Sequence, residues 1–282
     1  MVYPVGGIPG FTFGCDPELF IHDDKGNPVP AVGLIPGTKE APHKVAGGAV
    51  QLDGLAAEFN IDPVTNFSDF NRNITMVMKQ LHAMLPAGYG FLVQPAVTFT
   101  PEQMEALPDS AKVMGCDPDY NAWTGEVNPI PDTTETPGLR TASGHLHVGW
   151  TNGMDTNDAD HIGHCRDLTK QLDYYLGAWS VKLDSDMTRR KLYGKAGAFR
   201  PKPYGAEYRV LSNFWLTTRD RRCTVWNRMI NGINHMQRTF LPEKATEADN
   251  AAIIARINEG AKSTDRTYFP VQSLDTYYQK IR

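Results

Sequence analysis

The sequence predicts a globular fold of mixed helices and strands, without the regular βαβ alternation of a parallel sheet. Three observations support this class. Short stretches with strand character are separated by turn residues, and helical periodicity is confined to a few longer blocks. The composition is also ordinary: of the 282 residues, 41% are hydrophobic and 21% are charged, which suits a chain with a substantial core.

Strand character dominates the first hundred residues. Residues 11–13 continue into residues 18–22 and then into a turn-rich hairpin signal. Residues 49–53 and 57–61 predict two strands around Gly54. A helix is predicted from Ser68 and Asp69 as far as Pro86, because its apolar residues recur at helical spacing. Strand character returns at residues 91–94 and 96–99.

The second half of the chain is richer in helix. Residues 115–141 are rich in Pro, Gly, Asn, Asp and Thr and predict a long loop, which is a common carrier of function. Residues 146–150 and 205–211 predict strands, and residues 157–181 predict a long helix. Two more helices are predicted near 217–239 and 246–259. We expect one domain over residues 1–282, with its core at about 11–240 and a C-terminal helix and tail at 241–282.

Charge and hydropathy argue against several classes of protein. The net charge is -4, from 28 Lys and Arg against 32 Asp and Glu, whereas nucleic-acid binders carry a basic surplus. No apolar run approaches the roughly 20 residues that span a membrane. The N-terminus lacks the basic start of a secretory signal, and the four cysteines form no C-x-x-C pair. We therefore expect a cytoplasmic protein with neither nucleic-acid nor membrane partners.

Four of the predicted strand segments each carry two polar residues, two positions apart. Side chains alternate along a strand, so each pair lies on one face. A solvated sheet face would give the same pattern, but glycines flank the histidine pair and favour close approach of a ligand. The pairs are Asp16 with Glu18, Glu58 with Asn60, His145 with His147, and Glu207 with Arg209.

If these strands are neighbours, the pairs bring several carboxylates and an imidazole together. Such a cluster needs a compensating cation, and its oxygen-rich donors favour Mg²⁺ or Mn²⁺ over zinc. Arginines precede and enter the last strand, and guanidinium groups grip phosphate and carboxylate. Carboxylates for metal and arginines for oxyanions are typical of phosphoryl transfer. The arginines are Arg189, Arg190, Arg200 and Arg209.

The order of these residues resembles that of the glutamine synthetase-like carboxylate–amine ligases. Within this superfamily, which includes glutamate–cysteine ligases, the chain is most similar to the tailed-phage amidoligases, the type 2 COOH–NH2 ligases. The resemblance covers roughly residues 11–240. The segments that carry it are GCDPELF, LDGLAAEFNI, GCDPDYNAWTGEVNP, RTASGHLHVGW and YGKAGAFRPKPYGAEYRVLSNFW.

The resemblance implies a fold and a reaction. The fold is α+β, with a curved antiparallel sheet, an active site on its concave face and helices behind. ATP phosphorylates a substrate carboxylate, and an amine then attacks the acyl phosphate to form an amide. The expected partners are a small-molecule or peptide carboxylate and an amine, with ATP and two or more Mg²⁺ or Mn²⁺ ions as cofactors. A homo-oligomer and a phage origin, hence a host cytoplasm, are compatible with it.

The resemblance also implies roles for individual residues. Glu18 and Glu58 match ligands of a first metal ion, and Asp53 either joins them or serves as a turn aspartate. Asp16, His147 and Glu207 match ligands of the ion that bridges the ATP phosphates, although Asp16 stands where glutamate is more usual. Arg200 and Arg209 match the arginines of phosphoryl transfer, with Glu207 beside them in the catalytic group. Arg189 is a weaker nucleotide contact, and His145 is expected either beside the metal ligands or in contact with the substrate.

Two other functions remain open at this point. The same cluster suits a metal-dependent hydrolase that activates water, and a ligase-like sheet also suits a non-catalytic binding protein. The arginines favour the ligase, because a simple hydrolase has less need of two phosphate-gripping groups. In the long loop, Asp117, Asp119 and Glu126 are either substrate contacts or a solvated acidic surface. His161, His164 and Cys165 are expected to be structural, because no fourth zinc ligand has suitable spacing.

Overall fold

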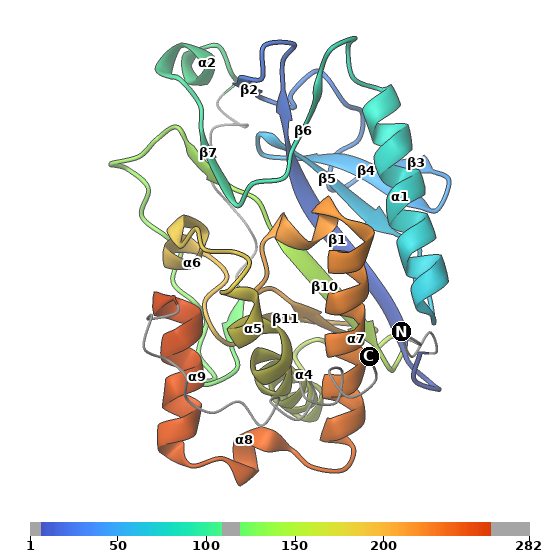
Figure 1. Ribbon diagram of the computed structural model, residues 1–282, viewed down its shortest axis with the longest axis vertical. Coiled ribbons are helices and arrows are strands. Elements are labelled where there is room, and N and C mark those ends of the chain that lie inside the picture. Colours follow the sequence, from blue (N-terminus) through green and yellow to red (C-terminus); the bar gives the residue numbers. More distant parts are fainter. Residues whose placement is uncertain (1–6, 109–118, 261–282) are drawn as a thin grey trace.

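The computed structural model describes residues 7–108 and 119–260 (Figure 1). In this part of the chain, ten strands form one sheet in which every pairing is antiparallel. In spatial order its main path is β3 (His43–Val45), β4 (Gly48–Asp53), β5 (Ala56–Ile61), β1 (Thr12–His22), β10 (Gly144–Gly149), β12 (Gly205–Tyr208), β11 (Ala198–Lys202) and β8 (Tyr120–Asn121). The prediction of mixed helices and strands without βαβ alternation is confirmed.

Strand β1 organises the sheet. It combines the two predicted strand segments at residues 11–13 and 18–22 into one strand of 11 residues. Its first half pairs with β10, and Glu18 and Leu19 pair with β5. Its end pairs with β2 (Pro28–Val29) and β6 (Gly90–Leu92). A separate two-stranded sheet joins β7 (Ala96–Thr98) to β9 (Leu139–Thr141).

Several helices begin at residues whose side chains cap them. Asn66 accepts a hydrogen bond of 3.0 Å from the amide of Asp69, and Thr218 accepts one of 3.1 Å from the amide of Arg221. These caps start α1 (Phe67–Ala83) and α7 (Arg219–Met236). The other helical segments are α2 (Pro101–Glu105), α4 (Ala159–Leu172), η1 (Asp173–Gly177), α5 (Ala178–Ser180), α6 (Thr188–Leu192), η2 (Asn213–Thr217), α8 (Leu241–Lys244) and α9 (Glu247–Glu259).

The long helix predicted at residues 157–181 contains a π-helical turn, η1, between α4 and α5. Such turns interrupt the regular ladder and re-aim side chains. Here the turn buries Asp173, which accepts hydrogen bonds from Trp123 Nε1 and the Gly197 amide, both at 2.7 Å, and from the Tyr208 hydroxyl at 2.8 Å. The helix is thereby tied to β12, to the segment that follows β8 and to the residue that precedes β11.

One face of the sheet forms the main core. Strand residues such as Phe13, Leu146 and Tyr208 are buried on it together with apolar residues of the long helices. The rings of Phe13 and Trp226 meet at 5.0 Å between centroids. Helix α1 packs on β4 and β5, and α4 packs on β11 and β12. Burying this face leaves the alternate strand positions on the opposite face for polar residues.

The sequence pattern did not predict β11. Pro201 lies in the middle of it, opposite Ala206, and proline cannot donate a hydrogen bond to a neighbouring strand. Part of the predicted 115–141 loop forms the short strands β8 and β9. The predicted tail beyond residue 260 lies outside the described residues. Among those that are described, no helix combines the length and apolarity needed to cross a membrane.

Candidate active site

The strand register gathers the predicted polar residues on one face of the sheet. Directly opposed residues in antiparallel strands share a face. Asp16 lies opposite His145, and Glu207 lies opposite both His147 and Arg200 on its two neighbouring strands. Further along the same face, Glu58 lies opposite both Glu18 and Gln51. We call this row, from Gln51 across to Arg200, the polar row.

Asp16, His147 and Glu207 form the tightest group in the row. Among the described residues, each of these three side chains offers one possible metal-ligand atom, and the three atoms all lie within 4.8 Å of one another. His147 Nε2 is 2.9 Å from Asp16 Oδ1. Yet these two atoms and Glu207 Oε2 are buried without a hydrogen bond of acceptable geometry in the described part of the chain. Buried ligand atoms left without hydrogen bonds fit a divalent cation.

Neighbouring charges favour the ionised forms of Asp16 and Glu207 and the protonated form of His147. Burial opposes ionisation of Asp16, but His147 and His145 outweigh it and hold the pKa of Asp16 well below its usual range. Burial and Asp16 act against Glu207 in the same way, yet Arg209, His145 and Lys202 lower its pKa. Burial would lower the pKa of His147, but Asp16 raises it. A metal ion at Nε2 therefore has to displace a proton.

His145 completes this group without the same charge. Its Nδ1 lies 3.3 Å from both Asp16 Oδ1 and Glu207 Oε1. Burial, assisted by Arg209, lowers the pKa of His145 to about 4, so its imidazole is neutral near pH 7. A neutral ring between two carboxylates supports their positions, in line with the expectation that His145 stands beside the ligands.

The second carboxylate group, Glu18, Asp53 and Glu58, is more open and carries fewer cations. Glu18 accepts a 2.8 Å hydrogen bond from the Ser143 amide, and Glu58 accepts one of 2.8 Å from Gln51 Nε2. Burial, then Asp53, raises the pKa of Glu18 to about 7. Burial, with Asp16, Asp53 and Glu18, raises the pKa of Glu58 well above its usual value. Asp53 is bound to Lys39, whose Nζ lies at 2.8 Å.

Three basic side chains surround Glu207, which has no exposed surface. Lys202 Nζ lies 2.7 Å and Arg200 Nη1 lies 3.7 Å from Glu207 Oε2, while Arg209 Nη1 donates to Oε1. Arg209 Nε also donates to Asp119 Oδ2 at 3.0 Å. The two predicted phosphate-contacting arginines therefore meet at the carboxylate that also belongs to the tight group.

Arg189 takes a different position from the one expected of a nucleotide contact. It is buried, with 1% exposure, and donates at 3.0 Å to the carbonyls of Val210 and Arg209 and to the Ser143 hydroxyl. Its guanidinium thus holds the end of β12, where Arg209 follows. Gly194 rests on it with φ +71°, and a Cβ there would lie 2.0 Å from Arg189 Nη1. Arg189 therefore bonds to protein acceptors beside the site, and a nucleotide contact from it stays a prediction.

Two residues next to the polar row were not predicted from the sequence. Lys202 follows Arg200 by two positions in β11, so strand alternation would have placed it on the same face, had β11 been predicted. Tyr204 lies in the turn between β11 and β12, and its hydroxyl hydrogen-bonds to His147 Nδ1. The two rings stack, with an angle of 16° between their planes. No sequence signal identifies Tyr204, because the contact depends on how the hairpin folds over β10.

The other sequence candidates lie apart from the row. His161 Nε2 is 2.8 Å from the Lys202 carbonyl, and Cys165 Sγ is 3.3 Å from the Gly205 carbonyl, so both support the β11–β12 hairpin, as expected of structural residues. Cys15, Cys165 and Cys223 are buried free thiols. Glu126 is exposed. Asp117 and Cys116 lie outside the described residues.

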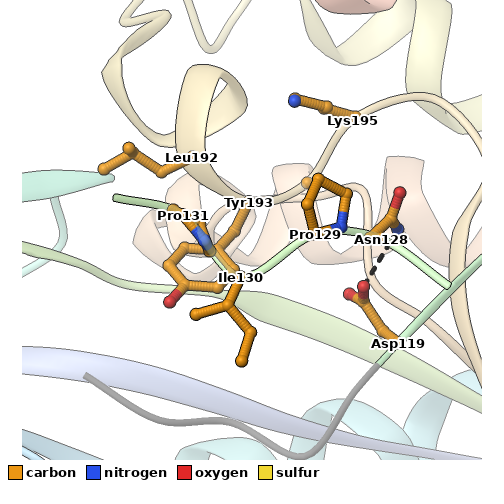
Figure 2. Close-up of a pocket in the computed structure, with 9 residues that line it drawn as sticks. Asp119, Asn128, Pro129, Ile130, Pro131, Leu192, Tyr193 and Lys195 are labelled. Atoms are coloured by element: carbon orange, nitrogen blue, oxygen red, sulfur yellow. Dashed lines mark hydrogen bonds between the residues drawn. The ribbon is translucent and has the colours of Figure 1, made fainter. Parts of the chain in front are cut away.

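A pocket borders the row at Asp119 (Figure 2). It holds an empty volume of about 450 Å³, including the part open to solvent, between residues 128–131 and residues 192–195. Asn128 Nδ2 donates to Asp119 Oδ1 at 2.9 Å, while the other oxygen of Asp119 accepts from Arg209. The carboxylate of Asp119 therefore connects the pocket to the cations around Glu207.

No family profile and no curated protein sequence matches this chain. Among solved structures, the chain is similar to one described as a bifunctional glutathione synthetase from Pasteurella multocida, with a TM-score of 0.48 and 11% sequence identity. The match covers 95% of this chain and 43% of that one, so the chain spans less than half the length of this neighbour. At this degree of similarity, the function has to be inferred from the site itself.

Proposed function

We propose that this protein is an ATP-dependent carboxylate–amine ligase that forms an amide through an acyl phosphate. The observation that supports the proposal is the meeting of metal-ligand and phosphate-gripping groups at Glu207. The carboxylate lies in the compact Asp16–His147–Glu207 group and in contact with three basic side chains. Phosphoryl transfer requires such positioning and charge neutralisation.

In the first step, an oxygen of the substrate carboxylate bonds to the γ-phosphorus as the bond to the ADP oxygen breaks. Asp16, His147 and Glu207 would hold one divalent cation, and Glu18 and Glu58, with Asp53, would hold another. When bound, Mg²⁺ or Mn²⁺ supplies positive charge to the phosphate oxygens. Arg200 and Arg209 grip the transferred phosphoryl group and offset its charge in the transition state. Lys202, which the geometry adds to this set, is a third cation beside the same carboxylate.

In the second step, the amine lone pair attacks the acyl carbon, the C–N bond forms, and phosphate leaves with the electrons of the C–O bond. The amine has to be neutral when it attacks, so a nearby base takes its proton. The substrates in this proposal are a small-molecule or peptide carboxylate and an amine. The relationship to tailed-phage amidoligases, the glutamine synthetase-like curvature of the sheet and a cytoplasmic location belong to the same proposal.

The proposal is tested by ADP release with Mg²⁺ and a panel of carboxylic acids in hydroxylamine buffer. Hydroxylamine converts an acyl phosphate into a hydroxamate, so ADP and hydroxamate in equal amounts with one acid support the ligase and identify its acyl substrate. Metal-dependent release of product from simple esters or amides, without ATP consumption and without hydroxamate, would favour the metal-dependent hydrolase. Failure to bind ATP would contradict the ligase, and failure to bind any divalent metal ion would contradict both enzymes.

A further inference from the structure

A lysine already provides a positive charge at the second carboxylate group (Glu18, Asp53 and Glu58), which we call the open group. Lys39 lies in the segment between β2 and β3, and its Nζ is 2.8 Å from Asp53 Oδ1. Glu18 and Glu58 instead accept hydrogen bonds, from a backbone amide and from a glutamine side chain. Asp53 is therefore the member of the open group whose charge is neutralised by an ion pair with the protein.

The backbone that carries Lys39 is fixed to the sheet. The Gly37 carbonyl accepts a hydrogen bond of 3.1 Å from the amide of Leu52 in β4. Gly37 has φ +90°, and a Cβ there would lie 2.4 Å from the Val50 carbonyl oxygen, so glycine allows this close packing. Two residues further on, the side chain of Lys39 is 45% exposed. Its ammonium can therefore leave Asp53 by rotation of the side chain, without movement of the segment.

Asp53 is placed to bind either Lys39 or a metal ion. It ends β4 and lies on the same face of that strand as Gln51, which bonds to Glu58. The ligand atoms of the tight group lie within 4.8 Å of one another, and in the described part of the chain the open group does not reach this compactness. In the absence of a metal ion, Asp53 is thus held by Lys39 and does not join Glu18 and Glu58 as a third ligand.

We infer that Lys39 takes the place of a divalent cation in the metal-free protein, and that Mg²⁺ or Mn²⁺ entering the open group displaces its ammonium from Asp53. The ion and the ammonium compete for the same carboxylate. The ion carries twice the charge and can also bind Glu18 and Glu58, so it gains more from the group than the lysine does. The inference rests on the part of the proposed function that assigns a cation to this group, but not on the ligase reaction.

Lys202 provides a comparison at the tight group. Its Nζ lies 2.7 Å from Glu207 Oε2, so an ammonium lies beside a proposed ligand atom there as well. At Glu207, however, Arg200 and Arg209 also form ion pairs with the carboxylate. Removal of Lys202 would leave these two cations in place. Competition between an ammonium and a metal ion is therefore measured more clearly at Lys39.

Mn²⁺ binding to the purified protein without nucleotide, measured by electron paramagnetic resonance, tests the inference. Glu58→Gln removes a carboxylate from the open group and none from the tight group, so the Mn²⁺ ion that it weakens most is the one bound at the open group. We expect Lys39→Met to raise the affinity for this ion about three- to fivefold, the size of a partly exposed ion pair. Lys39→Arg keeps a cation that can pair with Asp53 and should stay within about twofold of wild type.

A double-mutant cycle separates displacement from a general effect of positive charge. In Asp53→Asn the shared carboxylate is gone, so Lys39 has no ion pair there for the metal ion to break. Adding Lys39→Met to this variant should therefore leave the Mn²⁺ affinity unchanged, whereas repulsion between Lys39 and the ion at a distance would give the same gain with or without Asp53. Lys44→Met, at an exposed lysine of β3, is the matched control and should bind like wild type. Lys39 and Asp53 are both partly exposed, so neither change is expected to unfold the protein, and thermal melting checks this.

Three results would overturn the inference: Glu58→Gln weakens no Mn²⁺ ion, Lys39→Met binds Mn²⁺ no more tightly than wild type, or Lys39→Met gives an equal gain in the Asp53→Asn background. The hydroxamate assay decides the ligase proposal separately. Hydroxamate formation by wild type, together with any of these results, would refute the role of Lys39 alone. A gain from Lys39→Met that requires Asp53, without hydroxamate from any acid, would refute the ligase and leave the displacement.

Discussion

The two ends of the polar row differ in how their charges are balanced. Around Asp16 and Glu207, the chain supplies its own cations, and the pKa of both carboxyls is lowered. Around Glu18 and Glu58, the pKa of both is raised, because burial and neighbouring carboxylates act together and Lys39 reaches Asp53 only. The carboxylates at one end are therefore neutralised by basic side chains of the protein itself. Those at the other end would be stabilised most by a cation that binds from solution.

The largest effect is expected at the balanced end. Glu207→Gln keeps the shape of the side chain but removes the charge that holds Lys202, Arg200 and Arg209. We expect ADP release to fall by about 10³-fold, the scale of losing a main electrostatic group in an active site. Circular dichroism and thermal melting check folding, and Glu105→Gln, at an exposed carboxylate, is the matched control. A variant with normal turnover would show that this end does not carry the chemistry.

Arg209→Lys tests whether geometry or charge alone matters there. A lysine keeps the positive charge but cannot bridge Asp119 and Glu207 as the planar guanidinium does. We expect kcat for ADP release to fall about 100-fold, on the scale of one oriented donor in an active site. Arg238→Lys, at an exposed arginine just after the end of α7, should leave kcat unchanged. Equal rates for Arg209→Lys and wild type would argue for a simple counter-ion.

Tyr204→Phe tests how His147 is oriented. For Nε2 to bind a metal ion, Nδ1 has to carry the proton, which it donates to the Tyr204 oxygen. Loss of this acceptor should weaken Mn²⁺ binding about tenfold, as is common for such supporting contacts. Electron paramagnetic resonance of free Mn²⁺ measures the affinity in the protein without nucleotide. Unchanged affinity would remove Tyr204 from the site.

The smallest effect concerns pH at the open end. The pKa of Glu18 is about 7 in the folded protein and ordinarily 4.5, so the folded protein holds a proton between these values that the unfolded chain releases. The stability that this proton provides is complete below pH 4.5 and is lost as the pH rises through 7. Mn²⁺ has to displace the same proton, so its affinity should rise severalfold from pH 6 to pH 8.

Calorimetry in two buffers with different ionisation enthalpies measures this proton release. At pH 6 we expect release on Mn²⁺ binding in wild type and less in Glu18→Gln, which has no proton to lose at that position. Release that is identical in both proteins would show that the proton does not come from Glu18, and would leave Glu58 and His147 as its sources.

Much of the fold follows from local patterns. The predicted strands at residues 49–53 and 57–61 and the helices near 217–239 and 246–259 are found within a few residues of their expected bounds. Strand β11 was not predicted, because it contains Pro201, which has no amide hydrogen to donate to a neighbouring strand. The local pattern does not reveal that β12 pairs with this segment. With β11 hidden, Lys202 was missed as well.

The candidate site, like the fold, has a part that local patterns predict and a part that they do not. Alternation along each strand placed Asp16 with Glu18 and His145 with His147 on common faces, and this part needed no structure. Whether Asp16, His147 and Glu207 lie close together depends on the register between strands that are far apart in sequence. The pairing that places His147 opposite Glu207 is one example. The burial of Arg189 behind the site also depends on that packing.

By itself, the sequence determined which residue types share a face, because period-two alternation is a property of the strand backbone. Only the tertiary structure decided that Glu207 meets Lys202, that Tyr204 reaches His147, and that Asp119 joins the pocket to Arg209. These contacts arise from sheet register and hairpin packing, which are set by long-range burial of the opposite, apolar face.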